Sequence, residues 1–302
     1  MSTTKEVKIF KLSISVTLVI AAIGILFGLL SGSQSILFDG IFSTIDTAMS
    51  ILSVLVIKLM AKESTSRFQF GFWHFEPIVA TVNGSIILLL CLYAQLNAIL
   101  NIIDGGQSLT FSFATIYAVL VCSVCFGMYF YEKRVNKQLK SDLLQIDVNS
   151  WLMSSLITSA LLVAFIIGLL IQGTQYEYWS PYIDSVALLV LTVFFIPVPL
   201  KILKQSLQEI FLVASKELDN EVNQLVSEIV KQHGLVNYES YVVKTGRLYS
   251  IEIHLITSES FAKEQGVIAL DNIREQIASQ LSIPAQQRWL TICFTSKEKW
   301  SC

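Results

Sequence analysis

The chain has 302 residues, of which 53% are hydrophobic and only 15% are charged, and its formal net charge is −2. A soluble domain carries roughly 25% charged residues, and a soluble monomer this apolar would expose large hydrophobic patches, which soluble proteins avoid. The composition therefore predicts a membrane protein, and the net charge gives no indication of nucleic-acid binding. The five cysteines form no even, loop-rich framework, so we interpret them as small apolar residues rather than disulfide partners.

Six apolar stretches are long enough to span a bilayer, because a transmembrane helix needs about 20 mostly apolar residues. They lie at residues 12–31, 36–58, 78–101, 111–131, 147–172 and 183–203. The first stretch is interpreted as a span rather than a removed signal, since it is long and has no small-residue cleavage site. We expect residues 1–208 to form a bundle of six transmembrane helices.

Lysine and arginine occur in alternate connections between these stretches. They precede the first span, follow the sixth, and lie between spans two and three and between spans four and five, whereas the loops GSQS, DGGQS and QGTQYEYWSPY contain none. The positive-inside rule therefore predicts that both termini are cytoplasmic. We expect a multi-pass protein of a bacterial inner (plasma) membrane. Aromatic residues of the third of these loops are expected at the opposite membrane interface.

The composition changes after about residue 208. Residues 209–302 contain nine Lys and Arg residues and twelve Asp and Glu residues. Apolar periodicity and turn signals predict, in this order, a helix at 218–232 ended by Gly234, strands at 241–243 and 248–255, a helix at 260–281 and a strand at 289–294. The order helix–strand–strand–helix–strand predicts a small α+β domain on the cytoplasmic side.

Two aspartates lie within the second predicted span. Asp39 and Asp46 are seven residues apart, which places them on one helix face about two turns apart, and Ser43, Ser50 and Ser53 share that stripe. Ionisable side chains inside a membrane are costly and usually functional. We therefore interpret the two carboxylates as functional groups, although Asp39 is expected near the outer interface.

The fifth predicted span carries a similar stripe. Asp147 is followed by Ser150, Ser154 and Thr158 at helical spacing. Two such stripes facing each other would make a polar path across the bilayer, while the alternative is that the hydroxyl groups join helices together. Carboxylates and hydroxyls without imidazole or thiolate suit Mg²⁺, Mn²⁺ or a similar hard cation better than zinc.

Other chemistry-bearing residues have simpler interpretations. Cys122 and Cys125 have redox-motif spacing but lie inside the fourth span, so we expect them to pack in the core. His74, in a short cytoplasmic loop, is interpreted as an interfacial histidine or, alternatively, as a regulatory latch or proton site. His254, in a predicted strand, is interpreted as a sheet histidine or, alternatively, as a regulatory metal ligand.

Several stretches together resemble the cation diffusion facilitator family. They are SILFDGIFSTIDTAMSILS, RFQFGFWHFEPIVATVNG, QIDVNSWLMSSLITSALLVA and YIDSVALLVLTVFFIPVPLKILKQSLQEIFL. The predicted order of the C-terminal elements matches the family's ferredoxin-like cytoplasmic domain, so the resemblance covers nearly the whole chain. It implies a homodimeric, non-enzymatic transporter that exports divalent metal ions from the cytoplasm, usually in exchange for protons, with no cofactor beyond the transported cation.

The resemblance also implies where a cation would bind. The family's four mid-membrane ligands fall on Phe42, Asp46, Ser150 and Ser154, so only Asp46 remains a charged ligand. The cation would then be a harder ion than zinc. The residues expected to hold it are Asp46, Asp39, Asp147, Ser150 and Ser154, with Asn149 or Asn83 as a further ligand.

Three functions are consistent with these residues. The first is an ion-coupled exporter of a divalent cation, with Asp46 as the anchor. The second is a non-transporting regulator or partner subunit, which the lost ligand positions favour. The third is a carrier of an organic or monovalent cation, with Phe42 and Trp151 lining the route. An enzyme is the weakest interpretation, because no nucleophile–base pair or cofactor motif occurs in a cytoplasmic segment.

Overall fold

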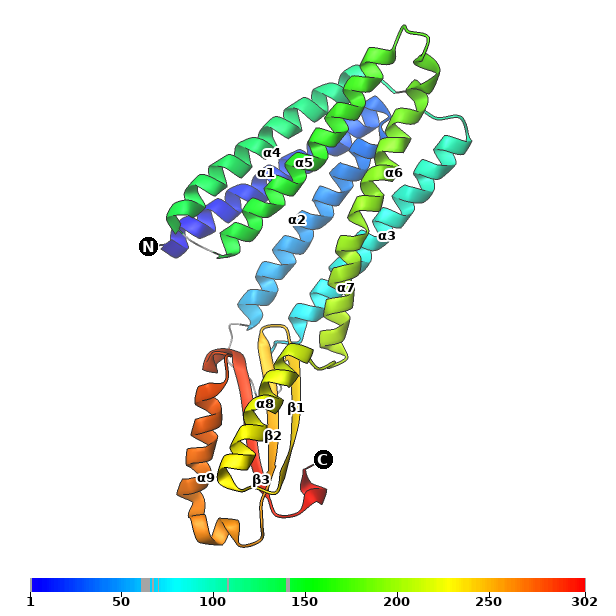
Figure 1. Cartoon of the computed structure of the whole chain (residues 1–302). Helices are drawn as coiled ribbons and strands as arrows, with labels where there is room; N and C mark the ends of the chain where they lie inside the picture. Colours follow the sequence, from blue (N-terminus) through cyan, green and yellow to red (C-terminus); the bar gives the residue numbers. More distant parts are fainter. Residues whose placement is uncertain are drawn as a thin grey trace. The chain divides into compact units, whose positions relative to one another are not determined.

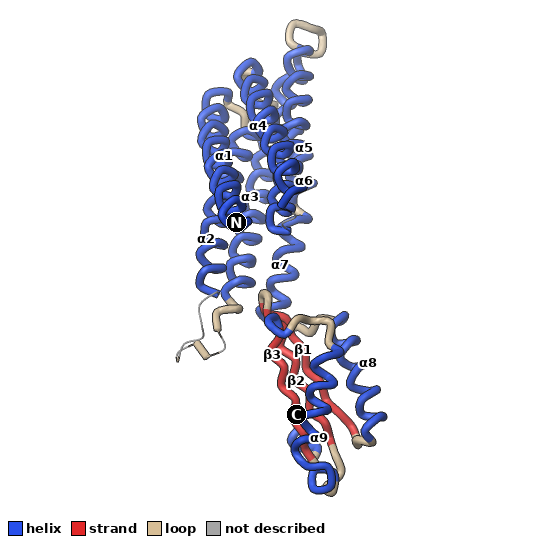
Figure 2. The backbone as a smooth tube through the Cα atoms, turned by 90° about the vertical axis from the view of Figure 1, so that its left-hand side faces the viewer, coloured by secondary structure: helices blue, strands red, loops and turns tan. Residues whose placement is uncertain are grey.

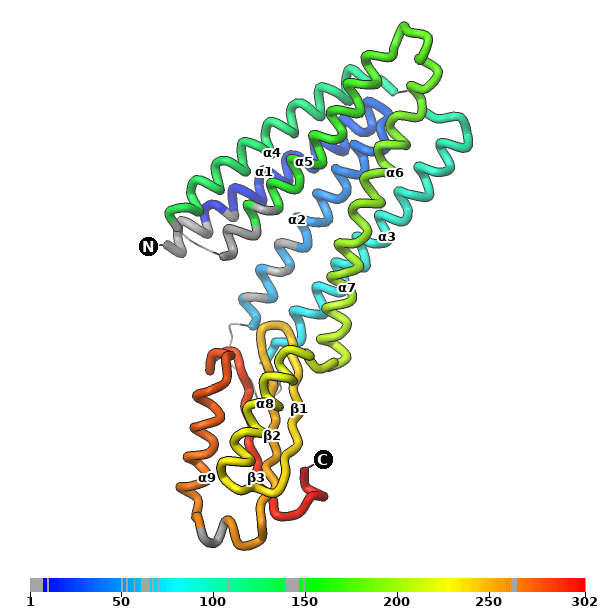
Figure 3. The backbone as a smooth tube through the Cα atoms, in the orientation of Figure 1, coloured from blue at the N-terminus to red at the C-terminus, as the bar shows by residue number. Residues whose placement is uncertain are grey.

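A computed structural model describes residues 2–60, 66, 68–69, 71–107, 109–139 and 142–301. The description of side chains leaves out residues 2–7, 10, 50, 53, 57, 139, 142–146, 149 and 262–264, and Figure 3 draws the omitted parts in grey. The chain divides into two compact units. The first comprises Met1–Val54 and Val82–Lys201, and the second comprises Leu55–Thr81 and Ile202–Cys302. The division of the chain at residue 208 stays a prediction.

Long apolar helices make up most of the chain, and the prediction of six transmembrane spans is confirmed. Within the described ranges, six helical stretches are long and apolar enough to cross a membrane. They are built from α1 (Ser2–Ser31), α2 (Gln34–Met60), α3 (Phe75–Ile103), α4 (Phe111–Leu139), α5 (Asp142–Ile171), α6 (Ile183–Phe195) and α7 (Pro197–Ile210). A short 3₁₀ helix, η1 (Glu177–Tyr182), precedes α6.

The sixth span differs from the single helix predicted at 183–203. It is divided at Ile196 into α6 and α7, which follow one another in Figure 1. Pro197 and Pro199 explain the division, because a proline has no backbone N–H to donate and its ring clashes with the carbonyl of the preceding turn.

In the first unit, α1, α4 and α5 lie side by side (Figure 1) and share a hydrophobic core. This core includes Phe111, Tyr117 and Phe165, each almost completely buried. The approach of α2 to α1 is set by small residues, since a Cβ added at Gly40 would lie 2.6 Å from the backbone nitrogen of Ile25. The membrane segment is therefore packed closely enough to fix the rotation of α2 about its axis.

The first turn of α2 is bound to the first turn of α6 through a buried carboxylate. Asp184, 3% exposed, accepts a hydrogen bond from the Ser33 hydroxyl at 2.6 Å and one from the Gln34 backbone N–H at 2.7 Å. The Ser35 N–H lies 3.3 Å from the same carboxylate. A carboxylate at a helix N-terminus meets unpaired N–H groups and the positive end of the helix dipole. Asp184 therefore holds the N-terminal end of α2 in place.

The second unit contains the predicted helix–strand–strand–helix–strand order, which is confirmed. Its elements are α8 (Lys216–His233), β1 (Asn237–Thr245), β2 (Leu248–Ile256), α9 (Phe261–Gln280) and β3 (Arg288–Thr295). Figure 2 shows the three strands as one sheet, in which β1 and β2 are antiparallel and β2 and β3 are parallel. Alternate residues of β2 pack against α8 and α9, and Gly234 ends α8 at a positive φ of 64° as predicted.

The turn between β1 and β2 is held by charged residues of the helices in the same unit. Glu209 accepts hydrogen bonds from Lys244 at 3.1 Å and from the Gly246 backbone N–H at 2.9 Å. Arg247 pairs with Glu76 at 3.3 Å. Gly246 has a φ of +60°, and a Cβ added there would lie 2.8 Å from the backbone oxygen of Trp73. Glycine is therefore required both by the turn and by the close contact.

Candidate functional site

A small polar cavity of about 80 Å³ lies inside the first unit, between α1, α2, α4, α5 and α6. Its wall is formed by Ser13, Thr17, Ile20, Asp39, Phe42, Ser43, Asp46, Val121, Cys125, Asp147, Ser150, Trp151, Ser154, Ile157, Thr158 and Phe195. The wall includes five of the six residues predicted for the transport path, namely Asp46, Asp39, Asp147, Ser150 and Ser154. The side chain of the sixth, Asn149, lies outside the described residues. The polar stripes of α2 and α5 thus face one cavity.

Asp46 and Asp147 are the acidic groups that meet from the two stripes. Asp46 lies near the middle of α2, and the charge of Asp147 on α5 acts on it across the cavity. Ser43 lies one turn before Asp46 on the same wall. Two carboxylates that face each other inside a membrane-spanning bundle repel one another unless a positive species lies between them. The arrangement is therefore suited to a cation.

Asp39 has a different environment from Asp46. Its Oδ2 accepts a hydrogen bond of 2.7 Å from the hydroxyl of Tyr117, a residue of α4 that is completely buried. This bond fixes the orientation of the Asp39 carboxylate and leaves it fewer lone pairs for other hydrogen bonds or for a cation. Asp39 lines the cavity as predicted, and the protein itself already supplies it with a hydrogen-bond donor.

Asp147 is positioned by α1. The Trp151 indole N–H donates a hydrogen bond of 3.0 Å to the Ser13 hydroxyl, and Ser13 in turn interacts with Asp147. The Oδ2 atom of Asp147 is buried and has no hydrogen-bond partner among the described residues. An unpaired carboxylate oxygen buried inside a helix bundle costs free energy that a bound cation could offset.

Several hydroxyls on the cavity wall bond to the backbone of their own helix. Thr158 donates to the Ser154 carbonyl at 2.9 Å, and Thr17 donates to the Ser13 carbonyl at 3.0 Å. One hydroxyl, that of Ser13, joins two helices through Trp151. The predicted alternative, that hydroxyls join helices, thus applies to Ser13.

The cavity offers fewer strong ligands than a typical transition-metal site. Within the described part of the chain, no three His, Cys, Asp or Glu side chains come together in a group able to hold a metal ion. Cys125 lines the cavity but belongs to the packed core of α4. A cation here would be held by two carboxylates, hydroxyls and water, a ligand set that hard cations accept.

Two acidic residues were not predicted from the sequence as site residues. Asp184 anchors α2 outside the cavity, and Glu132 of α4 lies buried beside Asp147. Glu132 could have been found from the spacing of the buried residues along α4. These are Phe111, Ala114, Tyr117, Ala118, Val121, Cys125, Met128, Glu132 and Asn136. This stripe has the spacing of a core-facing helix, and a glutamate lies within it.

The two histidines predicted as regulatory lie in the second unit. The His74 ring is exposed and packs 4.6 Å from the ring of Phe75. His254 pairs through Nε2 with Glu252 at 3.0 Å, and its Nδ1 is buried without a hydrogen-bond partner among the described residues. Neither lines the polar cavity, and a regulatory role for either stays a prediction.

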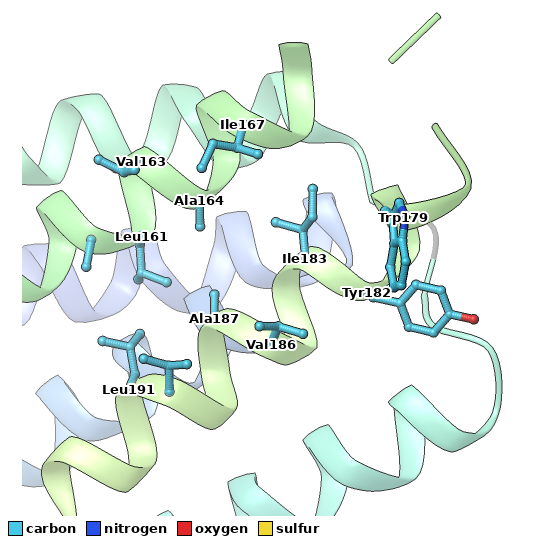
Figure 4. A pocket seen from close by; sticks show the side chains of 12 residues that line it. Leu161, Val163, Ala164, Ile167, Trp179, Tyr182, Ile183, Val186, Ala187 and Leu191 are labelled. Atoms are coloured by element: carbon cyan, nitrogen blue, oxygen red, sulfur yellow. The ribbon is translucent and has the colours of Figure 1, made fainter. Parts of the chain in front are cut away.

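A larger cavity of about 390 Å³ lies between α5 and α6 (Figure 4). Aliphatic side chains of the two helices face each other across it, and Trp179 and Tyr182 lie at one end. Because its wall is almost entirely apolar, it offers no ligands for an ion. We therefore place the candidate site in the smaller polar cavity despite its size.

Six membrane-crossing helices around an acidic cavity define a multi-pass membrane protein with a polar site inside its bundle. The family model for the cation efflux transmembrane domain matches residues 10–211. The chain belongs to this family, the cation diffusion facilitators, whose members are transporters of metal cations.

Similar proteins include MneP of Bacillus subtilis (strain 168), named a manganese efflux system protein. It is 21% identical over 288 residues, which cover 91% of this chain and 92% of MneP. The magnetosome protein MamB of Magnetospira sp. (strain QH-2) is 26% identical over 124 residues, which cover 41% of this chain and 42% of MamB. The magnetosome protein MamM of Magnetospirillum gryphiswaldense is 26% identical, with 39% of this chain and 37% of MamM covered. The matched part thus spans about two fifths of the magnetosome proteins.

Proposed function

We propose that this protein is a secondary transporter that exports a divalent metal cation from the cytoplasm in exchange for protons. The observation that carries the proposal is the cavity between α2 and α5, where Asp46 and Asp147 face each other. A pair of carboxylates in a membrane segment is favourable only when a positive species neutralises it. A cation and its exchanged protons would take turns in that role.

Manganese is the cation that we expect. The cavity wall supplies oxygen atoms from carboxylates and hydroxyls and no imidazole among the described residues, which favours a hard divalent ion over zinc. The name of MneP, a relative aligned over most of both chains, supports the same ion. The cavity of about 80 Å³ is also much smaller than the roughly 300–1,000 Å³ of organic-ligand pockets, which argues against an organic cation.

Alternating access would result from movement of helices around Asp46, as in other secondary transporters built from helix bundles. We propose that the protein acts as a homodimer in the bacterial inner membrane, with both termini in the cytoplasm. In that orientation, which the positive charges of the loops support, Asp147 lies nearer the cytoplasm than Asp39.

One observation favours a second candidate, a non-transporting subunit. Phe42, at a position where the family resemblance implies a ligand, lines the cavity and packs edge-on against Phe195 with ring centroids 5.3 Å apart. An aromatic plug at this position would leave the family scaffold intact while blocking passage. Such a protein would neither bind Mn²⁺ tightly nor carry it.

Uptake of Mn²⁺ into inverted membrane vesicles with an imposed pH gradient separates the two candidates. An exporter gives gradient-dependent uptake that falls at least about tenfold in Asp46→Asn, since a tenfold change corresponds to about 1.4 kcal/mol of lost interaction. Asp104→Asn removes a carboxylate from the exposed end of α3 and serves as the matched control. Equal uptake in the wild type and Asp46→Asn would refute the proposed site, and no uptake in the wild type would favour the non-transporting subunit.

A further inference from the structure

Glu132 is a carboxylate inside the core of the first unit. It lies on the buried stripe of α4, one turn beyond Met128 and one turn before Asn136, and its relative exposure is 0%. By strict geometry neither carboxylate oxygen receives a hydrogen bond from the described residues, although the side chains of Asp147 and Trp151 lie at hydrogen-bonding range. A buried carboxylate without donors is strongly unfavourable, so such a group either takes up a proton or has its charge compensated by another species.

The neighbouring basic residues do not supply that compensation. Lys133 and Arg134 follow Glu132 directly but are exposed on other faces of α4. The Lys133 ammonium donates to the Tyr129 hydroxyl at 2.6 Å and lies over its ring. Within the described residues, no Lys or Arg forms an ion pair with Glu132.

The group that faces Glu132 is a second carboxylate. Asp147 of α5 acts on it electrostatically and at hydrogen-bonding range, and the Oδ2 of Asp147 is itself buried and unpaired. The Trp151 indole N–H, which also lies at hydrogen-bonding range of Glu132, donates its hydrogen bond of 3.0 Å to the Ser13 hydroxyl. Two acidic side chains with buried oxygen atoms therefore meet where α4 packs against α5.

We propose that Glu132 and Asp147 form a second position for the transported cation, next to the position beside Asp46. Two carboxylates supplemented by water are a sufficient set for a hard divalent cation, which keeps several of its water ligands. Asp147 would bridge the two positions, so that both can hold a cation at the same time, and a cation would pass from one to the next by exchanging Glu132 for Asp46. This inference rests on the proposed function and adds a staging step to its path.

The number of bound cations tests the second position directly. Equilibrium dialysis of the purified full-length protein against Mn²⁺ should give about two equivalents per chain for the wild type. It should give about one for Glu132→Gln, about one for Asp46→Asn and none for the double variant. Asp104→Asn should bind like the wild type. A wild-type count in Glu132→Gln overturns the inference, as does a single wild-type equivalent that each variant alone abolishes.

Two further measurements keep the test independent of folding and of transport. Thermal melting without Mn²⁺ should place Glu132→Gln at or above the wild type, because the substitution removes a buried unpaired charge, and the stabilisation by added Mn²⁺ should be smaller. Glu132→Asp should restore the second equivalent at lower affinity, and failure to do so counts against a ligand role. The vesicle flux assay reports separately on the proposed function, because a wild type that binds Mn²⁺ but does not transport it refutes transport. The number of bound Mn²⁺ equivalents still decides whether Glu132 is a ligand.

Discussion

The contact between Asp184 and the start of α2 leads to a prediction about stability. Replacing Asp184 by Asn keeps the shape of the side chain but removes its charge and turns one acceptor into a donor. The carboxylate receives hydrogen bonds of 2.6 Å from Ser33 and 2.7 Å from Gln34, with a third N–H at 3.3 Å. In Asp184→Asn the single amide oxygen can accept only one of the two short bonds. If it accepts from Gln34, the bond to Ser33 has to reverse, with the amide donating to a hydroxyl oxygen that already accepts from the Ile36 N–H.

The size of the effect follows from these contacts. A hydrogen bond to a charged group contributes about 1.5–3 kcal/mol, and a negative charge at a helix N-terminus adds about 0.3–1 kcal/mol. With Asp184 and Ser33 both almost fully buried, we expect Asp184→Asn to lower the free energy of unfolding by about 2–4 kcal/mol. On the slope of about 2–4 °C per kcal/mol for domains of 150–250 residues, the melting temperature falls by roughly 5–15 °C.

The measurement is thermal melting of the purified full-length protein in detergent, followed by tryptophan fluorescence and by the loss of monodisperse material. Asp104→Asn makes the same chemical change at an exposed helix end and should melt like the wild type. If Asp184→Asn melts within about 1 °C of that control, the buried carboxylate does not hold the start of α2, and the reasoning is wrong.

Three other substitutions test packing and the cavity. Gly40→Ala places a methyl group 2.6 Å from a backbone nitrogen of α1 and should reduce the yield of folded protein. Gly127→Ala, with open space around it, is the control and should be neutral or slightly stabilising by helix propensity. Equal yields of the two variants would contradict the close approach of α2 to α1. Gly246→Ala and Gly234→Ala both place an alanine at a positive φ, but only at Gly246 would the new Cβ meet a backbone oxygen, at 2.8 Å. The melting temperature should therefore fall further in Gly246→Ala, and similar losses in the two variants would show that the contact is unimportant. Phe42→Asp adds a carboxylate to the cavity wall and should tighten Mn²⁺ binding at least about tenfold by calorimetry, while unchanged or weaker binding would place the cation elsewhere.

The six membrane spans and the order of the C-terminal elements could be predicted because they depend on patterns local in the sequence. Hydropathy alone separates the six spans, and turn residues such as Gly234 mark where elements end. The pairing of the α2 and α5 stripes required more: the resemblance supplied the fold in which those helices are neighbours. With that fold assumed, Asp39, Asp46 and Asp147 followed from their spacing.

Glu132 could not be predicted in the same way. The fourth apolar stretch ends at residue 131, so Glu132 falls among the charges of the following loop, next to Lys133 and Arg134. In the structure α4 continues to Leu139, and the burial pattern continues with it. Hydropathy averages over all faces of a helix, so it cannot show that one charged residue points inward while its neighbours point outward. The phase of the buried stripe, extended by one turn, provides that information.

The positions of the acidic groups explain how this chain could keep the family's chemistry without the family's ligand pattern. The positions that the resemblance assigns to ligands on α5 hold Ser150 and Ser154, and only Asp46 remains on α2. The missing charge is found one turn earlier on α5, at Asp147, and across from it on α4, at Glu132. Because electrostatic attraction depends on where carboxylates lie in space and not on which helix carries them, a cation path displaced toward these residues requires no ligand at Phe42. The aromatic residue can then serve as packing against Phe195 while the path runs beside it.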